Sequence, residues 1–326
     1  MRSLAIGFVA AFALAGAAVS AQYGDVVDGH VAAAKTAAGT NHLALFNSLC
    51  AANTIKPSDN PPQRGGRAGG PAAGPPERST WHADPVKVFD NLYFVGMADV
   101  SAWAVKTSDG LILLDAIYDY SIEDEVVNGL KTLGLNPATI KYALVSHGHV
   151  DHFGGAKYLQ EHFGTKILMS AADWELIAAS RNANKPTRDQ VVSDGQALTL
   201  GDTTLTFTLT PGHTPGTVST LIPVTDNGVK HLVAEWGGTG FNFPRNAETF
   251  RTYAASADRF KDIATRAGAD ALISNHSGPD GSKTKLPALA LRKPGDPHPY
   301  VIGQKAVQDY LTVAGECARA VLAAMN

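Results

Sequence analysis

Seven consecutive residues near the middle of the chain, Ser146-His147-Gly148-His149-Val150-Asp151-His152, carry four side chains that commonly bind metal ions. They follow directly on the apolar run from Ile140 to Val145, which predicts a buried strand. Imidazoles together with a carboxylate suit zinc, which takes three protein ligands at a catalytic site and leaves a position open for water. A solvated polar turn is the alternative, but so many metal-binding side chains in so short a segment favour a metal centre.

Two further histidines stand where additional ligands are expected. His213 lies in the segment Thr210 to Gly216 (TPGHTPG), whose prolines and glycines restrict the backbone and present the side chain from a rigid loop. His276 follows the apolar strand predicted at Ala271 to Ser274. We therefore expect both to complete the metal centre. The remaining histidines lack such settings and are expected to be structural or surface residues: His30, His42, His82, His162, His231 and His298.

The first 21 residues have the features of a secretory signal peptide. Arg2 supplies a positive charge, residues 4–19 are almost uninterruptedly apolar, and small residues precede a cleavage point after Ala21. A membrane anchor is the alternative, but the run is shorter than the roughly 20 residues that a spanning helix needs. We expect cleavage after Ala21 and a periplasmic or secreted location.

Export makes the two cysteines informative, because an oxidising compartment favours their pairing. Cys50 and Cys317 lie near the two ends of the mature chain, and neither belongs to a C-x-x-C pair that would suggest a thiolate metal site. We expect a disulfide that joins an N-terminal helix to a C-terminal one. Two buried free thiols are the alternative.

The mature chain divides into three parts. Residues 22–57 have helical spacing, residues 58–79 form a Pro/Gly-rich loop that could cover a cleft as a lid, and residues 80–326 alternate predicted strands with helices, as in a layered α/β domain. The formal charge of −3 and the absence of a basic run argue against a nucleic-acid partner. Strands are expected near residues 91–97, 101–107, 111–114, 140–145, 166–169, 205–209, 217–224, 231–235 and 271–274, and helices at 122–133, 155–163, 248–267 and 307–325.

The H-x-H-x-D-H motif, the later TPGHTPG segment and a final strand that ends in histidine resemble the metallo-β-lactamase superfamily. The resemblance extends over about Trp81 to Cys317, and Asn91 to Gly96 and Gly110 to Asp115 resemble the opening strands of that family. It implies an αββα sandwich, in which two β-sheets are flanked by helices. Subclass B3 metallo-β-lactamases are most similar, because the ligand set contains no cysteine and the segment His231 to Gly238 contains no aspartate.

The resemblance also implies two zinc ions. His147, His149 and His213 would bind one ion, and Asp151, His152 and His276 the other. A zinc-bound hydroxide would attack a carbonyl carbon, and the second ion, held by Asp151, would orient the water and stabilise the leaving amide nitrogen or alkoxide. Asp151 is therefore the expected catalytic residue. Asp115 and Glu235 are expected to support the ligands from behind through hydrogen bonds.

We therefore expect an exported dizinc metallo-hydrolase that acts on a small molecule, with the cyclic amide of β-lactams as the first candidate. Trp236 stands near a position where B3 enzymes commonly have a serine, so it is expected in the substrate pocket, where it would weaken β-lactam turnover. Packing of Trp236 in the core is the alternative. Three other functions stay open: hydrolysis of another lactone, ester or amide, a non-haem iron oxidoreductase, and a zinc-stabilised binding protein without catalysis.

Overall fold

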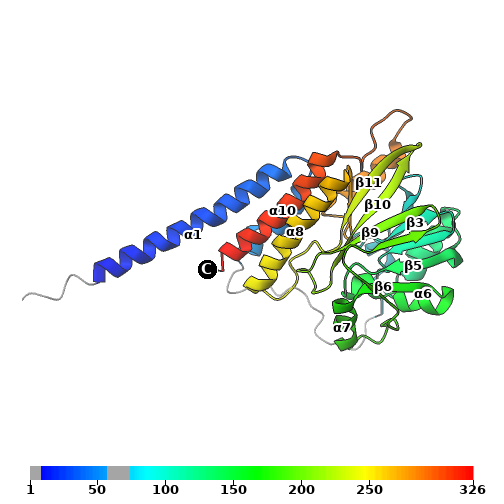
Figure 1. The fold of residues 1–326 in the computed structure, drawn as a ribbon, viewed down its shortest axis with the longest axis horizontal. Coiled ribbons are helices and arrows are strands. Elements are labelled where there is room, and N and C mark those ends of the chain that lie inside the picture. The colour runs from blue at the N-terminus through cyan, green and yellow to red at the C-terminus, as the bar shows by residue number, and fades with distance from the viewer. Residues whose placement is uncertain (1–8, 57–73, 326) are drawn as a thin grey trace, which may run out of the picture.

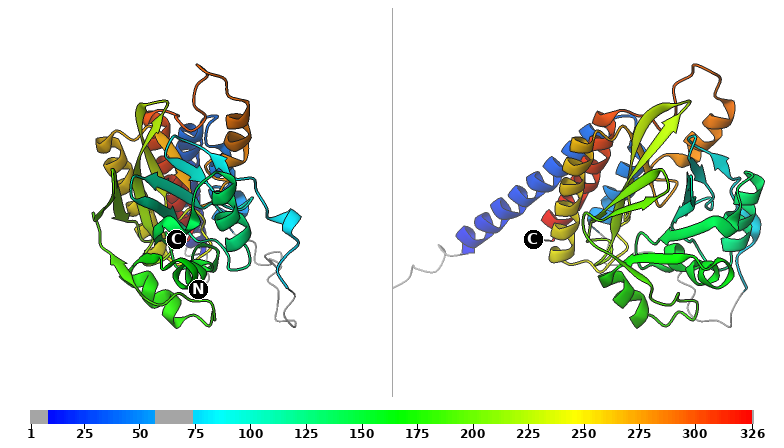
Figure 2. Two further views of the ribbon diagram at one scale, coloured as in Figure 1. Left: turned by 90° about the vertical axis from the view of Figure 1, so that its right-hand side faces the viewer. Right: turned by 45° about the vertical axis from the view of Figure 1, so that its right-hand side comes forward.

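The computed structural model describes the backbone of residues 9–56 and 74–325, with side chains from residue 24 onward. Two β-sheets lie face to face, and helices cover the outer face of each sheet (Figure 1). This arrangement confirms the predicted αββα sandwich. Figure 2 shows the same layers from two further sides, with the helices α8 and α10 on one side of the sandwich and the helices that follow β4 to β6 on the other.

The first sheet has seven strands in chain order, β1 to β7. Its first four strands form antiparallel pairs, and β4 to β7 run parallel. Parallel neighbours require crossovers, which are made by the short helices on its outer face. Its strands are β1 (Val86–Lys87), β2 (Leu92–Phe94), β3 (Trp103–Thr107), β4 (Gly110–Leu114), β5 (Ile140–Leu144), β6 (Lys166–Ser170) and β7 (Gln190–Val192).

The second sheet has five strands in the order β12-β11-β10-β9-β8. A hairpin around Asp226-Asn227-Gly228 joins β10 to β11, and Asn227 (φ 49°) and Gly228 (φ 82°) both adopt the positive φ that a tight turn of this kind requires. The strand β12 pairs in parallel with β11. The strands are β8 (Ala197–Leu200), β9 (Thr203–Leu209), β10 (Val218–Asp226), β11 (Val229–Trp236) and β12 (Ala271–Ser274).

The helices occupy the two outer layers. Against the first sheet lie a π-helix η2 (Ile122–Val127), α4 (Asn128–Thr132), α5 (Val150–Phe153), α6 (Ala156–Phe163) and α7 (Ala171–Ala179). Against the second lie α8 (Ala247–Ala267) and α10 (Gln304–Ala323), while α9 (Ser282–Leu291) follows β12. The helix α8 is capped at its N-terminus by Asn246, whose side chain accepts a hydrogen bond from the backbone N–H of Thr249, and at its C-terminus by Gly268, where φ is 79°.

The hydrophobic core lies in three layers that match the sandwich. Residues such as Phe94, Phe207 and Ile222 fill the space between the two sheets. Leu113, Val126 and Met169 belong to the layer between the first sheet and its helices. The third layer packs α8 and α10 on the second sheet. The metal-binding motif lies at the end of this packed scaffold, because it follows directly on β5.

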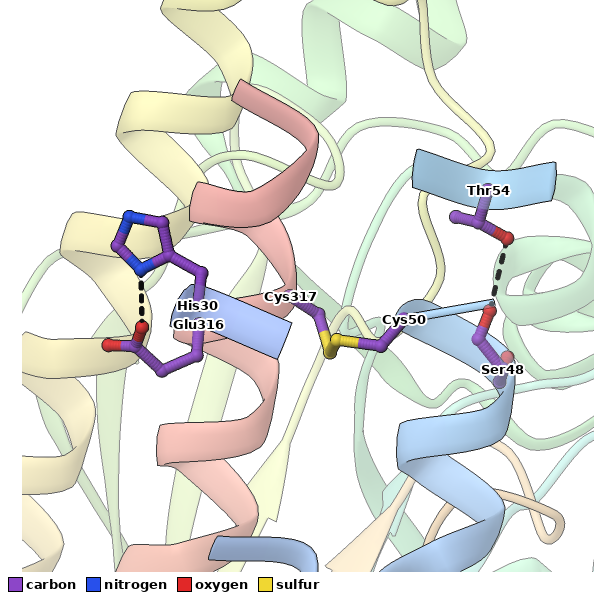
Figure 3. Close-up of a disulfide and its surroundings, with 6 residues drawn as sticks. All are labelled: His30, Ser48, Cys50, Thr54, Glu316 and Cys317. Atoms are coloured by element: carbon purple, nitrogen blue, oxygen red, sulfur yellow. Dashed lines mark hydrogen bonds and ion pairs between the residues drawn. A yellow bond between two sulfur atoms is a disulfide. The ribbon is translucent and has the colours of Figure 1, made fainter. Parts of the chain in front are cut away.

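The N-terminal part of the chain joins the third layer. The helix α1 (Val9–Ala38) runs beside α10, and its buried residues there include Val27, Ala34 and Ala38 (Figure 1). It is followed by α2 (Leu43–Leu49) and α3 (Ala52–Ile55). The predicted disulfide is confirmed, since Cys50 and Cys317 are bonded, with their Cα atoms 5.0 Å apart. Figure 3 shows how this bond fixes the end of α2 to α10.

Two predictions fall partly outside the described residues. Of the proposed signal peptide, residues 1–8 are not described, and of the Pro/Gly-rich loop only residues 74–79 are described, with a single 3-10 turn at Arg78–Thr80. The proposed lid therefore stays a prediction. Within the described ranges, no helix combines the length and hydropathy that a membrane span requires.

Candidate metal centre

Three histidines converge at one end of the sandwich. His147 and His149 follow β5, and His213 lies in the loop between β9 and β10. The Nε2 atom of His213 lies 3.0 Å from Nε2 of His147 and 3.1 Å from Nδ1 of His149. The structure thus brings together ring nitrogens from the two sheets, and the three residues form one of its two groups able to hold a metal ion among the described residues.

Hydrogen bonds on the far side of the rings fix which nitrogens face inward. The Nδ1 atom of His147 lies 2.8 Å from the carbonyl oxygen of Gly237, and Nδ1 of His213 lies 2.6 Å from that of Gly240. A carbonyl only accepts, so each Nδ1 carries the proton and each Nε2 is left with a lone pair. Inward-facing lone pairs repel one another unless a cation lies between them, so this donor set fits a metal ion.

Asp151, His152 and His276 form the second group. The Oδ2 atom of Asp151 lies 3.4 Å from Nε2 of His152 and 3.7 Å from Nε2 of His276. Nε2 of His152 is buried and has no hydrogen-bond partner among the described residues. A buried polar atom normally has a partner, and a bound metal ion would supply one here. The Nδ1 atom of His276 donates to the carbonyl oxygen of Asp99 at 2.9 Å, which turns Nε2 toward Asp151.

Electrostatics differ between the two groups. Burial lowers the pKa of His147 well below its ordinary value and that of His213 to about 3, so both imidazoles are neutral, as a metal ligand must be. Burial also opposes a charge on His152, but the carboxylates of Asp151 and Asp115 outweigh it and raise the pKa to about 10. The second group thus attracts positive charge, a proton or a metal ion.

Asp115 supports the second group as predicted. Its Oδ2 accepts a hydrogen bond from Nδ1 of His152 at 2.8 Å, and Oδ1 accepts one from the backbone N–H of Ser146 at 2.7 Å. These contacts orient His152 and tie the start of the motif to the end of β4. Asp115 adopts a φ of 64°, a left-handed conformation that is uncommon for a residue other than glycine and that the surrounding contacts hold in place.

Two residues that the sequence did not single out brace the ligand loops. Asp173, on α7, accepts hydrogen bonds from the backbone N–H of Gly148 at 2.8 Å, from the hydroxyl of Thr214 at 2.6 Å and from the backbone N–H of Gly216 at 2.9 Å. It thereby joins the His147–His149 loop to the loop of His213. Asn275 donates to the carbonyl of Gly237 at 2.6 Å, the same oxygen that receives the His147 proton. No motif marks either residue.

Close approach of the backbone explains two of the glycines around the site. A Cβ on Gly155 would lie 2.4 Å from the carbonyl oxygen of Ala116, at the point where the chain turns into α6. Gly212, next to His213, has a φ of 139°, and a Cβ there would lie 2.5 Å from Tyr253. Both ligand loops are therefore pressed against neighbouring elements where no side chain fits.

Trp236 is not in the substrate pocket, and this expectation is corrected. Its side chain is 1% exposed and packs with Phe260 in the layer beneath α8, and its Nε1 donates to the hydroxyl of Tyr253 at 3.2 Å. Successive residues of a strand point to opposite faces, and Trp236 lies on the helix-facing side of β11. It therefore faces away from the space between the sheets.

Glu235 also differs from its expected role. It is buried on β11, its Oε2 has no hydrogen-bond partner among the described residues, and no hydrogen bond described in the structure joins it to any of the six candidate ligands. Burial, together with the charge of Asp115, raises the pKa of Glu235 to about 8. A carboxyl in this setting is protonated at neutral pH and does not support a ligand directly.

Two recesses open beside His213. The first, called the Pro211 recess, measures about 430 Å³ and is bounded by His149 and His213 together with Leu176, Pro211 and Phe243. The second, called the Ser48 recess, measures about 370 Å³ and is bounded by His213 and His276 together with Ser48, Thr54 and Asn242. Neither has a lysine or arginine among its described lining residues. The candidate metal centre is thus accessible from both sides of His213.

Comparison with known proteins agrees with this geometry. Residues 95–226 match the family described as the metallo-beta-lactamase superfamily. Over these residues the chain carries a domain of the metallo-β-lactamase superfamily. The crystal structure of BJP-1, a subclass B3 metallo-beta-lactamase of Bradyrhizobium japonicum, is similar with a TM-score of 0.63 and 29% identity, covering 72% of this chain and 93% of that chain. The predicted similarity to subclass B3 is confirmed.

Curated relatives of this chain are named for other activities. A hydroxyacylglutathione hydrolase of Mesorhizobium japonicum is 33% identical over 108 residues, and an N-acyl homoserine lactonase of a Bacillus species is 32% identical over 125 residues. These matches cover 33% and 37% of this chain, and 38% and 48% of the relatives. The chain thus matches less than half the length of either relative.

Proposed function

We propose that this protein is an exported dizinc hydrolase that cleaves an amide or ester carbonyl, with the cyclic amide of β-lactams as the first candidate substrate. The observation that carries the proposal is the pair of adjacent three-residue groups between two recesses. Three neutral imidazoles face one point, and a carboxylate with two imidazoles faces the next. This donor set fits zinc, with nitrogen and oxygen ligands and no cysteine.

The residues of the chain have distinct tasks in this mechanism. Zinc, when bound, lowers the pKa of a coordinated water to about 7 and polarises a carbonyl oxygen. Asp151 offers an anionic oxygen beside His152 and His276, where it would orient the attacking water and hold its proton. Asp115 keeps the Nδ1 proton of His152 in place, so that Nε2 stays available. The recesses position the two ends of the substrate on either side of His213.

The similarity to a subclass B3 enzyme over 93% of its length favours β-lactams. The second candidate is a neutral lactone or ester, and a specific observation favours it. The fixed charges among the described lining residues are Asp99 in the Ser48 recess and Glu248 in the Pro211 recess. A substrate carboxylate would meet no cationic side chain there, and desolvating an unpaired carboxylate is costly.

Export remains part of the proposal. It rests on the signal-like N-terminus and is supported by the Cys50–Cys317 disulfide, since such bonds persist in oxidising compartments. Cleavage after Ala21 would leave the part of α1 that packs on α10, including Val27 and Ala34, in the mature protein.

The test combines a metal count with a substrate panel. Protein purified without added metal is analysed for zinc and iron, and then assayed with nitrocefin and with a series of acyl lactones. His149→Ala should reduce bound zinc and abolish hydrolysis, because it removes one ligand of the first group. His162→Ala, on the exposed side of α6, is the matched control and should keep both. Iron in place of zinc, or two equivalents of zinc in His149→Ala, would contradict the proposal.

A further inference from the structure

One wall of the Ser48 recess comes from a part of the chain far from the metal-binding motif. Ser48 and Leu49 end α2 and Thr54 lies in α3, and all three border the recess together with His213 and His276. The family match begins only at residue 95, so this wall is an addition to the matched region. We call residues 48–54 the N-terminal wall.

Three connections hold the N-terminal wall in place. The disulfide from Cys50 to Cys317 anchors it to α10, and the hydroxyl of Thr54 donates to the carbonyl of Ser48 at 3.3 Å, both drawn in Figure 3. On the other side the guanidinium of Arg245 donates to the carbonyl of Thr54 at 2.9 Å and also to that of Ile55. The wall is thus fixed to α10 and to the loop that precedes α8.

The described lining of the Ser48 recess is uncharged except for one carboxylate. Ser48, Thr54, Thr239 and Asn242 offer hydroxyl and amide groups, and Leu49 and Phe241 offer apolar surface. Asp99, its one carboxylate among the described lining residues, is paired with Lys283. Such a surface binds a neutral group that combines hydrogen-bonding atoms with apolar bulk.

We propose that the N-terminal wall determines which substrates the metal centre accepts, by binding a bulky neutral substituent next to the reacting carbonyl. This inference rests on the proposed metal centre, because the recess opens at His213 and His276. The disulfide is then part of the specificity device, since it holds Ser48 and Thr54 at a fixed distance from these ligands. A small substrate that reaches only the metal centre would not depend on the wall.

The test uses ligand binding, which does not require turnover. Cobalt(II) replaces zinc in the protein. Thiols are then titrated into it, and their binding is followed by the absorbance of the cobalt–thiolate bond. The probes are 2-mercaptoethanol, which is small, and N-benzyl-2-mercaptoacetamide, which carries a bulky neutral amide. Ser48→Trp should raise the Kd of the bulky thiol by about tenfold and leave that of 2-mercaptoethanol nearly unchanged, because the exposed Ser48 can be enlarged without disturbing the core.

Two matched controls separate the wall from general damage. Leu43→Trp introduces the same side chain at an exposed position of the same helix that does not border the recess, and should leave both Kd values unchanged. Cys50→Ala should weaken binding of the bulky thiol and leave binding of 2-mercaptoethanol nearly unchanged. His30→Ala, which removes the contact between α1 and Glu316 of α10, should change neither (Figure 3).

The outcomes distinguish the two proposals. In one outcome, the cobalt-loaded Ser48→Trp variant binds both thiols with the Kd values of the unsubstituted protein. This result would contradict the role of the N-terminal wall but not the metal centre. An equal loss of affinity for both thiols would also contradict the proposed role of the N-terminal wall, since it would show damage at the metal centre. A protein that binds no cobalt would overturn the metal centre and the wall together.

Discussion

At the scale of single residues, Asp173 shows how a side chain outside the ligand set can shape the site. Its carboxylate accepts hydrogen bonds from Gly148, Thr214 and Gly216, which flank three ligands on two loops. Burial raises the pKa of Asp173, and these donors act in the opposite direction by stabilising the ionised form. The residue therefore couples the positions of His147 and His149 to that of His213.

Replacing Asp173 tests this coupling. Asp173→Ala removes all three acceptor contacts and should weaken zinc binding by the first group by about 10- to 100-fold, the usual effect of losing a group that orients metal ligands. Asp173→Asn retains one acceptor oxygen and should have a smaller effect. Competition with a chromophoric chelator measures the zinc Kd.

Asp202→Ala is the matched control for this prediction. Asp202 is exposed, and its Oδ1 accepts a hydrogen bond from the backbone N–H of Ser108 at 3.1 Å, in the turn between β8 and β9 at the opposite end of β9 from the His213 loop. It should leave the zinc Kd unchanged. A zinc Kd in Asp173→Ala equal to that of the control would show that the loops keep their positions without this carboxylate.

At the scale of elements, β11 shows why the strand pattern alone misplaced two side chains. The strand was predicted correctly, but its neighbouring residues Glu235 and Trp236 point to opposite faces. Trp236 packs with Tyr253 and Phe260 of α8, which leaves Glu235 on the opposite face of β11. Which face of a central strand meets helices and which meets the other sheet depends on the order of strands, and that order is not encoded in any single segment.

The position of Glu235 predicts a specific pH dependence of stability. Its pKa rises from the ordinary value near 4.5 to about 8 in the folded protein, mainly through burial. The folded state thus holds the proton more tightly than the unfolded state, and stability falls as pH rises from the unfolded pKa through the folded one. Below the unfolded pKa both states are protonated and the group has no effect.

Glu235→Gln removes this dependence while keeping the shape of the side chain. Relative to the unsubstituted protein, the variant should be about equally stable at pH 5 and more stable at pH 9 by a few kcal/mol, at about 1.4 kcal/mol for each pKa unit. Urea unfolding at both pH values measures the difference. A stability difference that is the same at pH 5 and pH 9 would contradict the prediction.

The sequence predicted much of the element order, and the six candidate ligands that it singled out do lie in two groups, for a physical reason. The strands β4, β5 and β12 are short apolar runs, and the polar residues that follow them must lie at the sheet edge. The strand β7 and the helices α7 and α9 were not predicted, since α7 lacks an amphipathic pattern and α9 contains Pro287. The helix expected from Ile122 begins as a π-helix, with the buried Glu125 turned to His82 at 2.6 Å.

The supporting contacts of the site could not be predicted in the same way. The supporting hydrogen bonds made by Asp173, Asn275 and the carbonyl of Asp99 join segments that are remote in sequence. The N-terminal wall is a similar case, because Ser48 and Thr54 reach the recess only after the disulfide and Arg245 place them there. Such contacts follow from the tertiary fold and leave no local pattern.

At the scale of the whole molecule, the candidate metal centre joins the two halves of the sandwich. His147, His149, Asp151 and His152 follow a strand of the first sheet, whereas His213 and His276 follow strands of the second. Each three-residue group contains ligands from both halves. A bound ion therefore links the sheets at their common edge, so metal binding and stability must be thermodynamically coupled.

This coupling predicts that zinc stabilises the fold. A ligand that binds only the folded state stabilises it by about 4 kcal/mol at 1,000 times its Kd. Removal of metal with EDTA should lower the Tm by several degrees, and added zinc should restore it. His213→Ala breaks the first group from the side of the second sheet and should reduce the zinc-dependent rise, while His162→Ala should retain it in full. The Cys50–Cys317 disulfide cannot replace this link, because it joins α2 to α10 within the helical layer and not across the sheets. A Tm independent of zinc would therefore show that the candidate ligands do not hold an ion between the two halves.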